Sequence, residues 1–477
     1  MTPDWYDDAE MLVAVDAYLA RDTSPFIVPG HKGRGGVLHP TMERLLSSDL
    51  PLYGGIDTVR LERGLLADAE AKAAALWGAT WCRFSVGGSS HSNEALALSL
   101  GRPGDTVLVT RTAHRSTLLG LVLAGLKPVW LDNVVDDRYG IPAGLSIPAL
   151  RQALDEHPEA IAVLCVEPSY LGTMADVREI VRVAHQRDVP VVVDQAWGAH
   201  LGFAAGYPEH AMAAGADAMI ISAHKTLPSF SQASLILART DRLDAGRLER
   251  GFDVAHTTSP SGGILASIDA ARAILASATG RDLLVGLAER VERLRIRLRP
   301  SGLVVPGPAD FDGRFDPAKL VILTAPSGRS GLELERELDA VGIALEMADR
   351  DTLVPLATML DDDAALNRLG DALLAAMDRV QGEPRPIRLA AQWGSFSPQI
   401  VTPREAFFAD REAVPFDQAR GRTSAEVIAP YPPGVPVLVP GEEVTEDALM
   451  RLREAAAAGL VIRYAADPTL TTIQVLI

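Results

Sequence analysis

Short apolar runs alternate with amphipathic segments between about residues 80 and 240. The runs are rich in β-branched residues and predict strands buried on both faces, while apolar spacings of three and four residues predict helices. The expected strands are 106–110, 127–131, 161–166, 190–194, 218–222 and 234–238. The expected helices are 91–100, 115–125, 147–156 and 176–187. This alternation predicts an α/β domain with a mostly parallel sheet covered by helices on both faces.

The flanking regions predict two further parts. Before the α/β pattern lie two expected helices, at 8–20 and 65–78. Two Pro/Gly-rich stretches between them, at 25–36 and 52–58, could form an arm reaching a neighbouring subunit. After it come a helix-rich stretch at 264–299 and a linker at 300–313. Two strands, at 319–323 and 343–347, and two helices, at 331–341 and 364–380, are expected beyond the linker. We therefore expect an N-terminal segment (1–75), a large domain (76–299) and a smaller α+β domain (300–477).

Composition narrows the possible partners. The chain has 477 residues and a net charge of −17, which argues against binding to nucleic acid or to anionic membranes. Cys82 and Cys165 are far apart in apolar surroundings and predict two buried thiols, with neither a disulfide framework nor a metal site. The acidic N-terminus and the lack of a long apolar run predict a cytoplasmic protein without a membrane span.

Lysine is rare, which limits where amine chemistry can occur. Only five of the 45 basic residues are lysines: Lys32, Lys72, Lys127, Lys225 and Lys319. Lys72 lies in an expected helix, whereas Lys127 and Lys319 begin expected strands, and all three are expected to point to solvent. Lys32 lies in a glycine-rich loop that no strand accompanies.

Lys225 has the context of a reactive amine. It follows one apolar strand and precedes another, in the segment SAHKTLPSFSQASLIL, where Ser222 and His224 could hold a phosphate. A lysine there can form a Schiff base with a carbonyl cofactor, because partial burial lowers its pKa. The alternative is a lysine at a strand end that points to solvent.

Asp194 ends the most hydrophobic strand of the chain, in VVVDQAWGAHLGF. It could be a helix cap, or it could be the partner of a protonated ring nitrogen at the carboxyl edge of the sheet. Ala196, two residues further, is small enough to lie flat against such a ring.

Two more motifs follow strands. In FSVGGSSHSNEALAL, a Gly-Gly-Ser-Ser turn opens a helix, and Ser89, Ser90 and His91 are the expected phosphate ligands. In VTRTAHRSTLLG, His114 could stack on a planar cofactor or transfer a proton; a histidine that only begins a helix is the alternative. Together with Asp194 and Lys225, these motifs have the layout of fold-type I pyridoxal-phosphate enzymes.

The same residues resemble the Orn/Lys/Arg decarboxylase family over almost the whole chain. PFIVPGHKGRGG, AHRS, HKTLPSFSQAS, GRTSAEV and APYPPGVPVLVPGE are similar to segments of that family. The resemblance implies pyridoxal 5′-phosphate bound at Lys225, a pyridinium partner at Asp194 and ring stacking by His114. It also implies phosphate contacts from Ser89, Ser90, Ser222 and His224, and removal of the α-carboxyl group from lysine, arginine or ornithine.

The chain departs from the family pattern in places. Asp194-Gln195-Ala196-Trp197-Gly198 stands where short members carry Asp-Glu-Ala-His-Gly, and it places Trp197 beside the expected cofactor. Gly87-Gly88 stands where Asn-Gly is common. The length leaves no room for the wing domain of longer members, so we expect a homodimer with shared active sites, or a higher homo-oligomer.

The substrate and the reaction type stay open at this stage. Glu346, Asp349 and Asp57 are candidate partners for a basic side chain. Another reaction on the same fold, such as transamination or a lyase reaction, and a non-catalytic binding protein are the rival functions.

Overall fold

The structure is a computed structural model that describes residues 2–21, 27–31, 39–47, 49, 64–379, 382–387, 396–431 and 434–477. Lys32 and Asp57, together with most of the Pro/Gly-rich stretches expected to form an arm, lie outside the described residues. No helix in the described ranges combines the length and the apolar character that crossing a bilayer requires.

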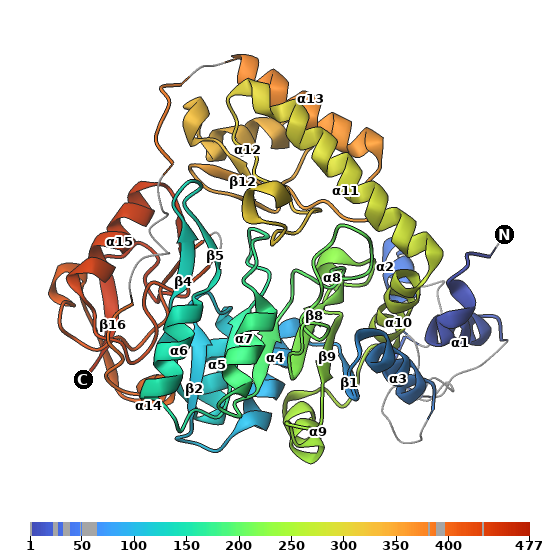
Figure 1. The fold of residues 1–477 in the computed structure, drawn as a ribbon, viewed down its shortest axis with the longest axis horizontal. Coiled ribbons are helices and arrows are strands. Elements are labelled where there is room, and N and C mark those ends of the chain that lie inside the picture. The colour runs from blue at the N-terminus through green and yellow to red at the C-terminus, as the bar shows by residue number, and fades with distance from the viewer. Residues whose placement is uncertain are drawn as a thin grey trace.

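A seven-stranded sheet forms the centre of the molecule, with the strand order β1-β9-β8-β7-β6-β2-β3 (Figure 1). The strands are β1 (Trp81–Ser85), β2 (Thr106–Thr110), β3 (Lys127–Leu131), β6 (Val163–Val166), β7 (Val191–Asp194), β8 (Ala218–Ser222) and β9 (Ser234–Ala238). The strand β9 runs antiparallel to its two neighbours, β1 and β8, and the other neighbouring strands of this sheet pair in parallel. The predicted mostly parallel sheet is confirmed, and the six predicted strands lie within two residues of their expected bounds.

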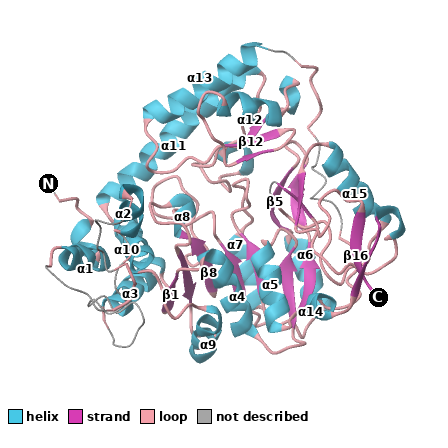
Figure 2. Cartoon of the chain, turned by 180° about the vertical axis from the view of Figure 1, so that it is seen from behind, coloured by secondary structure: helices cyan, strands magenta, loops and turns pink. Residues whose placement is uncertain are grey.

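Helices cover both faces of the sheet, as the continuous apolar strands require. On one face α4 (Gly88–Leu100), α5 (Arg115–Ala124) and α9 (Ala245–Ala255) pack on side chains that include Val107, Val192 and Ile220. On the other face α6 (Ile147–Glu156) and α7 (Val177–His185) pack on the intervening strand residues. The two views show α6 and α7 opposite α4 and α5 across the strands (Figures 1 and 2).

The N-terminal part packs on the large domain. Its helices are α1 (Glu10–Leu19), α2 (Pro40–Leu46) and α3 (Leu65–Trp77), and α1 lies against α10 (Gly262–Ala276). The backbone N–H of Met11 donates to buried Asp269 over 3.0 Å, and Asp269 also pairs with Arg272 at 2.7 Å. These contacts fix the described start of the chain to its own core.

Two units can be distinguished within residues 300–477, the range of the expected smaller α+β domain. In the first, the sheet β10 (Ile322–Leu323), β12 (Thr352–Val354) and β11 (Met347–Ala348) lies beside α12 (Gly331–Asp339), α13 (Asp363–Arg379) and the long α11 (Ala278–Leu298). The second has its own apolar cluster, around Ile428, Leu438 and Leu452. Figure 1 shows the two units on different sides of the central sheet.

The second unit contains short paired strands and two helices, and it completes the α/β domain. Its elements are α14 (Pro403–Phe408), β13 (Arg411–Pro415), β14 (Ala429–Tyr431), α15 (Glu446–Ala457), β15 (Val461–Arg463) and β16 (Thr472–Leu476). Arg111, directly after β2, forms a buried ion pair with Glu442 at 2.8 Å. This pair joins the second unit to the edge of the central sheet.

Two predicted strands differ from the structure, and one hairpin was not predicted. The strand expected at 319–323 covers only Ile322–Leu323, because the carbonyl of Lys319 accepts a hydrogen bond from Arg295 instead of a neighbouring strand. Only Met347 of the strand expected at 343–347 is in β11. The hairpin β4 (Asn133–Asp136) and β5 (Ile141–Leu145) was not predicted.

Candidate active site

Asp194 lies at the carboxyl end of β7, and its carboxylate is held from two sides. The side-chain amide of Asn93 donates to Oδ2 over 2.9 Å, and the backbone N–H of Ala196 donates to Oδ1 over 3.0 Å. Asn93 reaches the sheet edge from α4 and is itself buried. The sequence analysis missed Asn93, although it lies in the helix that follows the Gly-Gly-Ser-Ser turn.

Lys225 lies in the single helical turn α8 (Ala223–Thr226), directly after β8. Desolvation lowers the pKa of its amine, while the negative charges of Asp194 and Glu346 act in the opposite direction. The structure therefore brings Lys225 and Asp194, 31 residues apart, within electrostatic reach of one another at one edge of the sheet. The partly buried environment expected for Lys225 is present.

The predicted phosphate turn opens α4, whose N-cap Gly87 offers no capping side chain. Ser222 donates a hydrogen bond to Ser89 across 2.9 Å, and Ser90 is exposed beside it. Gly88 adopts φ +68°, a conformation that disfavours other residues, and its N–H donates to the carbonyl of Gln232. Backbone N–H groups and hydroxyls thus converge at one helix start.

The two histidines expected at the phosphate differ in their surroundings. His91 is buried, and its ring nitrogens lie 2.7 Å from Ser85 Oγ and 3.1 Å from the carbonyl of Phe252. With both nitrogens facing protein partners, His91 is placed in the core beneath the turn. Among the described residues, the hydrogen-bond partner of the His224 ring is the carbonyl of Ala233, which lies 2.8 Å from Nδ1, and desolvation lowers the pKa of this histidine.

His114 is the N-cap residue of α5, so it does begin a helix, as the alternative interpretation predicted. Its Nδ1 lies 2.7 Å from Ser116 Oγ, and that hydroxyl accepts from Asn93 over 3.0 Å. His114 is exposed, but nearby protein atoms desolvate its imidazole enough to lower the pKa. His114, Asn93 and Asp194 thus belong to one hydrogen-bonded chain.

Trp197 forms the next part of the site, beyond buried Ala196. The Nζ of Lys225 lies 4.3 Å from the centre of the Trp197 ring, and Tyr170 packs edge-on against the same indole with a centroid distance of 4.9 Å. An indole beside an amine stabilises its charged form through a cation–π contact. Trp197 therefore lies against the amine that the sequence selects.

Lys319 corrects a prediction, because it was expected to point to solvent and is only 5% exposed. Its Nζ lies 4.1 Å from the centre of the Trp197 ring and 5.0 Å from that of Tyr170. Burial lowers its pKa to about 8. The two other lysines expected at the surface are less buried: Lys127 is exposed, and Lys72 pairs with Asp8 and Glu10.

The candidate acids Glu346 and Asp349 differ in their exposure and in their hydrogen-bond partners. Glu346 is exposed, and its Oε1 lies 3.4 Å from the hydroxyl of Tyr170, close enough to affect the pKa values of Lys225 and Lys319. Asp349 instead caps the turn between β11 and β12 by accepting from the N–H of Asp351 over 2.8 Å, and burial raises its pKa to about 6.

A second buried acid lies at the same edge. Glu167 follows β6 and accepts backbone N–H bonds from Ala175 at 2.8 Å and Leu145 at 3.2 Å. Burial raises its pKa to about 7, against the effect of those two donors. Glu167 was not predicted from the sequence. Its carboxylate joins β5 to the segment before α7 by accepting a backbone hydrogen bond from each.

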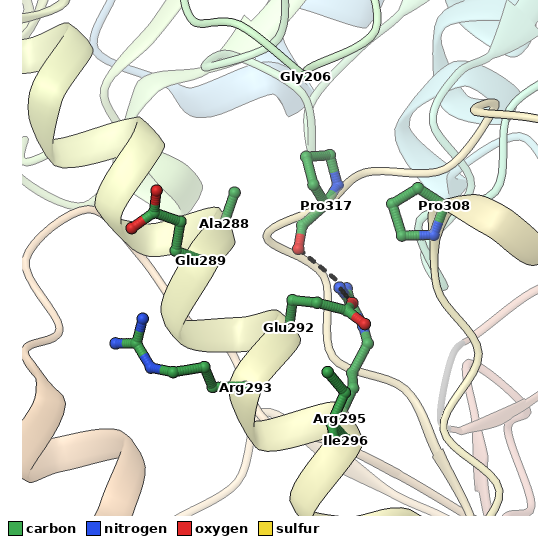
Figure 3. Close-up of a pocket in the computed structure, with 9 residues that line it drawn as sticks. All are labelled: Gly206, Ala288, Glu289, Glu292, Arg293, Arg295, Ile296, Pro308 and Pro317. Carbon is green, nitrogen blue, oxygen red and sulfur yellow. Dashed lines mark hydrogen bonds and ion pairs between the residues drawn. The ribbon is translucent and has the colours of Figure 1, made fainter.

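A separate pocket of about 490 Å³ lies outside this group, between α11 and the segment 308–317 (Figure 3). Its lining includes Arg295 and Pro317 but none of the predicted site residues. In Figure 3 the guanidinium of Arg295 reaches the carbonyl of Pro317, at 2.9 Å.

The residues at the sheet edge fit pyridoxal phosphate. The uncapped start of α4 and the facing hydroxyls of Ser89 and Ser222 suit a phosphate. The fixed carboxylate of Asp194 suits a protonated ring nitrogen, and the amine of Lys225 suits a carbonyl.

Comparison with known proteins agrees with this arrangement. The family model for the major domain of Orn/Lys/Arg decarboxylases matches residues 11–305, and the model for their C-terminal domain matches residues 390–457. The arginine decarboxylase of Halalkalibacterium halodurans is 34% identical over 98% of each chain.

Solved structures share the fold. The Francisella novicida lysine decarboxylase superposes with a TM-score of 0.82 at 21% identity, covering 98% of this chain and 81% of that one. A structure described as SPT with PLP superposes with a TM-score of 0.52 at 16% identity, over 66% of this chain and 77% of that one. The predicted fold-type I architecture is confirmed, and the chain belongs to the Orn/Lys/Arg decarboxylase family.

Proposed function

We propose that this decarboxylase of basic amino acids acts on arginine and releases carbon dioxide and the corresponding amine. Relatives that match over 98% of this chain include arginine decarboxylases, which favours arginine over lysine and ornithine. The observation that carries the reaction is the placement of a desolvated Lys225 amine within the field of Asp194, whose carboxylate two donors hold in place.

Each predicted residue has a place around the cofactor in this proposal. Pyridoxal phosphate, when bound, supplies a protonated ring that accepts the electron pair left by the departing carboxyl group. Lys225 would hold its carbonyl carbon and Asp194 its ring nitrogen, and His114, Ala196 and Trp197 would contact the ring. The phosphate would lie against Ser89, Ser90, Ser222 and His224. We leave His91 out of this set, because both of its nitrogens face protein partners.

The chain's own groups prepare the site for proton transfer. Because desolvation lowers the pKa of Lys225, a larger fraction of its amine is neutral near pH 7 than for a lysine in water, and only the neutral amine is a nucleophile. The lowered pKa of His114 keeps its imidazole neutral, which suits contact with an aromatic ring. Lys225 is also the amine placed to return a proton to the α-carbon.

The cationic end of the substrate needs an acidic partner, and Glu346 fits this role. The side chain of Glu346 is exposed, and the hydroxyl of Tyr170 donates to its Oε1 over 3.4 Å. Asp349 is less suitable, because its carboxylate caps a turn. Asp57, the third candidate, stays a prediction.

The wider setting is part of the same proposal. We expect a cytoplasmic enzyme of amino-acid metabolism that supplies polyamine synthesis and forms a homodimer, or a higher homo-oligomer, with shared active sites. We also expect an N-terminal segment at 1–75, a large domain at 76–299 and a smaller α+β domain at 300–477. Light scattering of the purified protein tests the assembly, and a monomer with full activity would contradict shared sites.

A panel of amino acids tests the reaction. Purified protein supplied with pyridoxal phosphate should turn yellow and should release carbon dioxide and an equimolar amine from arginine, less from lysine or ornithine. Lys225→Ala should abolish both products and the covalent attachment of the cofactor, whereas Lys127→Ala at an exposed strand end should change neither. A keto acid product would indicate transamination, and a protein that stays colourless would indicate a non-catalytic relative.

A further inference from the structure

Lys319 is a buried amine for which the described residues provide no hydrogen-bond acceptor. Its side chain is 5% exposed, and its Nζ lies against the faces of Trp197 and Tyr170. Lys225 lies against the same Trp197 indole at 4.3 Å. Of the five lysines, two therefore meet at one aromatic residue in the site, and only one of them is needed to hold the cofactor.

The surrounding backbone fixes the direction of the Lys319 side chain. Arg295 donates to the carbonyl of Pro317 over 2.9 Å (Figure 3) and to that of Lys319 over 2.6 Å. The N–H of Asp316 donates to the carbonyl of Gly172. A Cβ at Gly172 would lie 2.6 Å from Cγ of Lys319, so this glycine leaves the space that the lysine occupies. These contacts hold the backbone at Lys319, and the absent side chain of Gly172 leaves room for the first atoms of the lysine side chain.

The charges around Lys319 do not provide a direct partner. Asp316 is hydrogen-bonded to His200 at 3.0 Å and to the N–H of Ala318 at 2.9 Å, and Glu346 is oriented by Tyr170. Both acids act on Lys319 through space, while Lys225 opposes its charge. With a pKa of about 8, Lys319 is still mostly an ammonium at pH 7, and a buried ammonium without an acceptor is costly.

We propose that Lys319 binds the α-carboxylate of the amino-acid substrate. This inference rests on the proposed function, because that function supplies the ligand. The carboxylate is one bond away from the carbon whose amino group must reach the position of Lys225. The Nζ atoms of Lys225 and Lys319 both lie close to the centre of the Trp197 ring, at 4.3 Å and 4.1 Å. The other anion of the site, the phosphate, has its own ligands at the start of α4.

The charge pattern of the site matches the whole substrate. A basic amino acid carries an anion at the α-carbon and a cation at the far end. Tyr170 lies between the matching protein charges, with the Lys319 ammonium on its ring and the Glu346 carboxylate near its hydroxyl. The product amine has lost the anion, so Lys319 distinguishes substrate from product.

Paired affinities test this role without relying on turnover. In a Lys225→Ala background, calorimetric titrations with arginine and with agmatine, its decarboxylation product, are compared with and without Lys319→Met in the presence of pyridoxal phosphate. We expect Lys319→Met to weaken arginine binding roughly 10- to 100-fold, the range of a charge-assisted hydrogen bond. Agmatine affinity should change less than about twofold. An equal loss for both ligands, or no loss for arginine, would overturn the proposal.

A second variant and a control cover the case in which Lys319→Met does not fold. Lys319→Arg keeps the positive charge and should recover part of the preference for arginine; no recovery would count against carboxylate binding. Lys72→Met removes a lysine that pairs with Asp8 and Glu10, away from the site, and should leave both affinities unchanged.

The failure of the proposed function would look different. Wild-type protein that releases no carbon dioxide from arginine, lysine or ornithine would refute the function. If lysine or ornithine proves to be the substrate, the same comparison uses that amino acid and its amine. Wild-type protein that decarboxylates, with a Lys319→Met variant that loses both affinities equally, would refute only the role of Lys319.

Discussion

The side-chain amide of Asn93 lies 2.9 Å from Oδ2 of Asp194, so a helix on one face of the sheet positions an acid at its edge. A buried hydrogen bond to a charged group is worth about 1.5–3 kcal/mol. We therefore expect Asn93→Ala to weaken cofactor binding and to lower kcat/KM roughly tenfold or more. Equilibrium dialysis with pyridoxal phosphate and steady-state rates measure the two effects.

The control for this prediction is Gln152→Ala, which removes an exposed side-chain amide that donates to Glu156 within α6. Both parameters should then stay at wild-type values. If Asn93→Ala also left them unchanged, the contact with Asp194 would have no part in positioning the acid.

The depressed pKa of Lys319 predicts a stability that depends on pH. Its pKa is about 8 in the folded protein and 10.5 as a reference for the unfolded chain, so the unfolded state binds more protons between these values. The Lys319 contribution to the free energy of unfolding is therefore most unfavourable below pH 8 and becomes less so as the pH rises. Between pH 7 and 9.5 the titration of Lys319 should raise the free energy of unfolding of the wild-type protein by about 2 kcal/mol, and Lys319→Met should lack this increase.

Chemical denaturation at several pH values measures this difference. A constant difference between the two proteins would show that Lys319 does not titrate in this range. Selective ¹³C labelling of the lysine side chains adds a direct measurement, because only five signals are expected and the one lost in the variant should titrate near pH 8.

The buried ion pair between Arg111 and Glu442 predicts a large effect of breaking it from one side. Arg111 is 4% exposed, Glu442 is fully buried, and desolvation raises the pKa of Glu442 against the influence of Arg111. Removing one partner of such a pair typically costs about 3–5 kcal/mol. Glu442→Gln should destabilise the protein by an amount in this range, measured by denaturant unfolding.

The double variant Arg111→Met/Glu442→Met is the companion experiment. It leaves no unpaired charge and should be less destabilised than either single variant. Additive losses would show that the two charges do not act as a pair. Arg293→Gln, which loses an exposed pair with Asp363, should change stability by less than about 1 kcal/mol.

The two thiols offer a simple test of the core. Cys82 and Cys165 are both buried, as predicted, and burial raises the pKa of Cys165 further above the range in which a thiolate forms. A thiol reagent should therefore label neither cysteine in the native protein and both after unfolding. Rapid labelling of native protein would contradict the packing around β1 and β6.

The sequence predicted the parts of the fold that depend on local patterns. The strands of the central sheet are continuous apolar runs, and Asp194 and Lys225 follow two of them, so their meeting at one edge could be inferred. The split of 300–477 into two units could not, because it depends on which apolar surfaces find one another.

The missed residues depend on distant contacts. A lysine that begins an apolar run is ordinarily exposed, and Lys319 is buried only because Gly172 and Arg295 enclose it from other parts of the chain. Asn93 has no pattern of its own within α4. His91 stands in a turn rich in hydroxyls, yet the carbonyl of Phe252 in α9 draws its ring into the core.

The ion pair of Arg111 and Glu442 also has a consequence for the order in which the chain acquires its structure. The two residues are 331 positions apart. At about 5–20 residues per second, a ribosome takes roughly 15 to 65 seconds to add Glu442 after Arg111. During that interval the nascent large domain carries an arginine whose final counter-ion does not yet exist. This part of the sheet edge can acquire its ion pair only after Glu442 has been added to the chain.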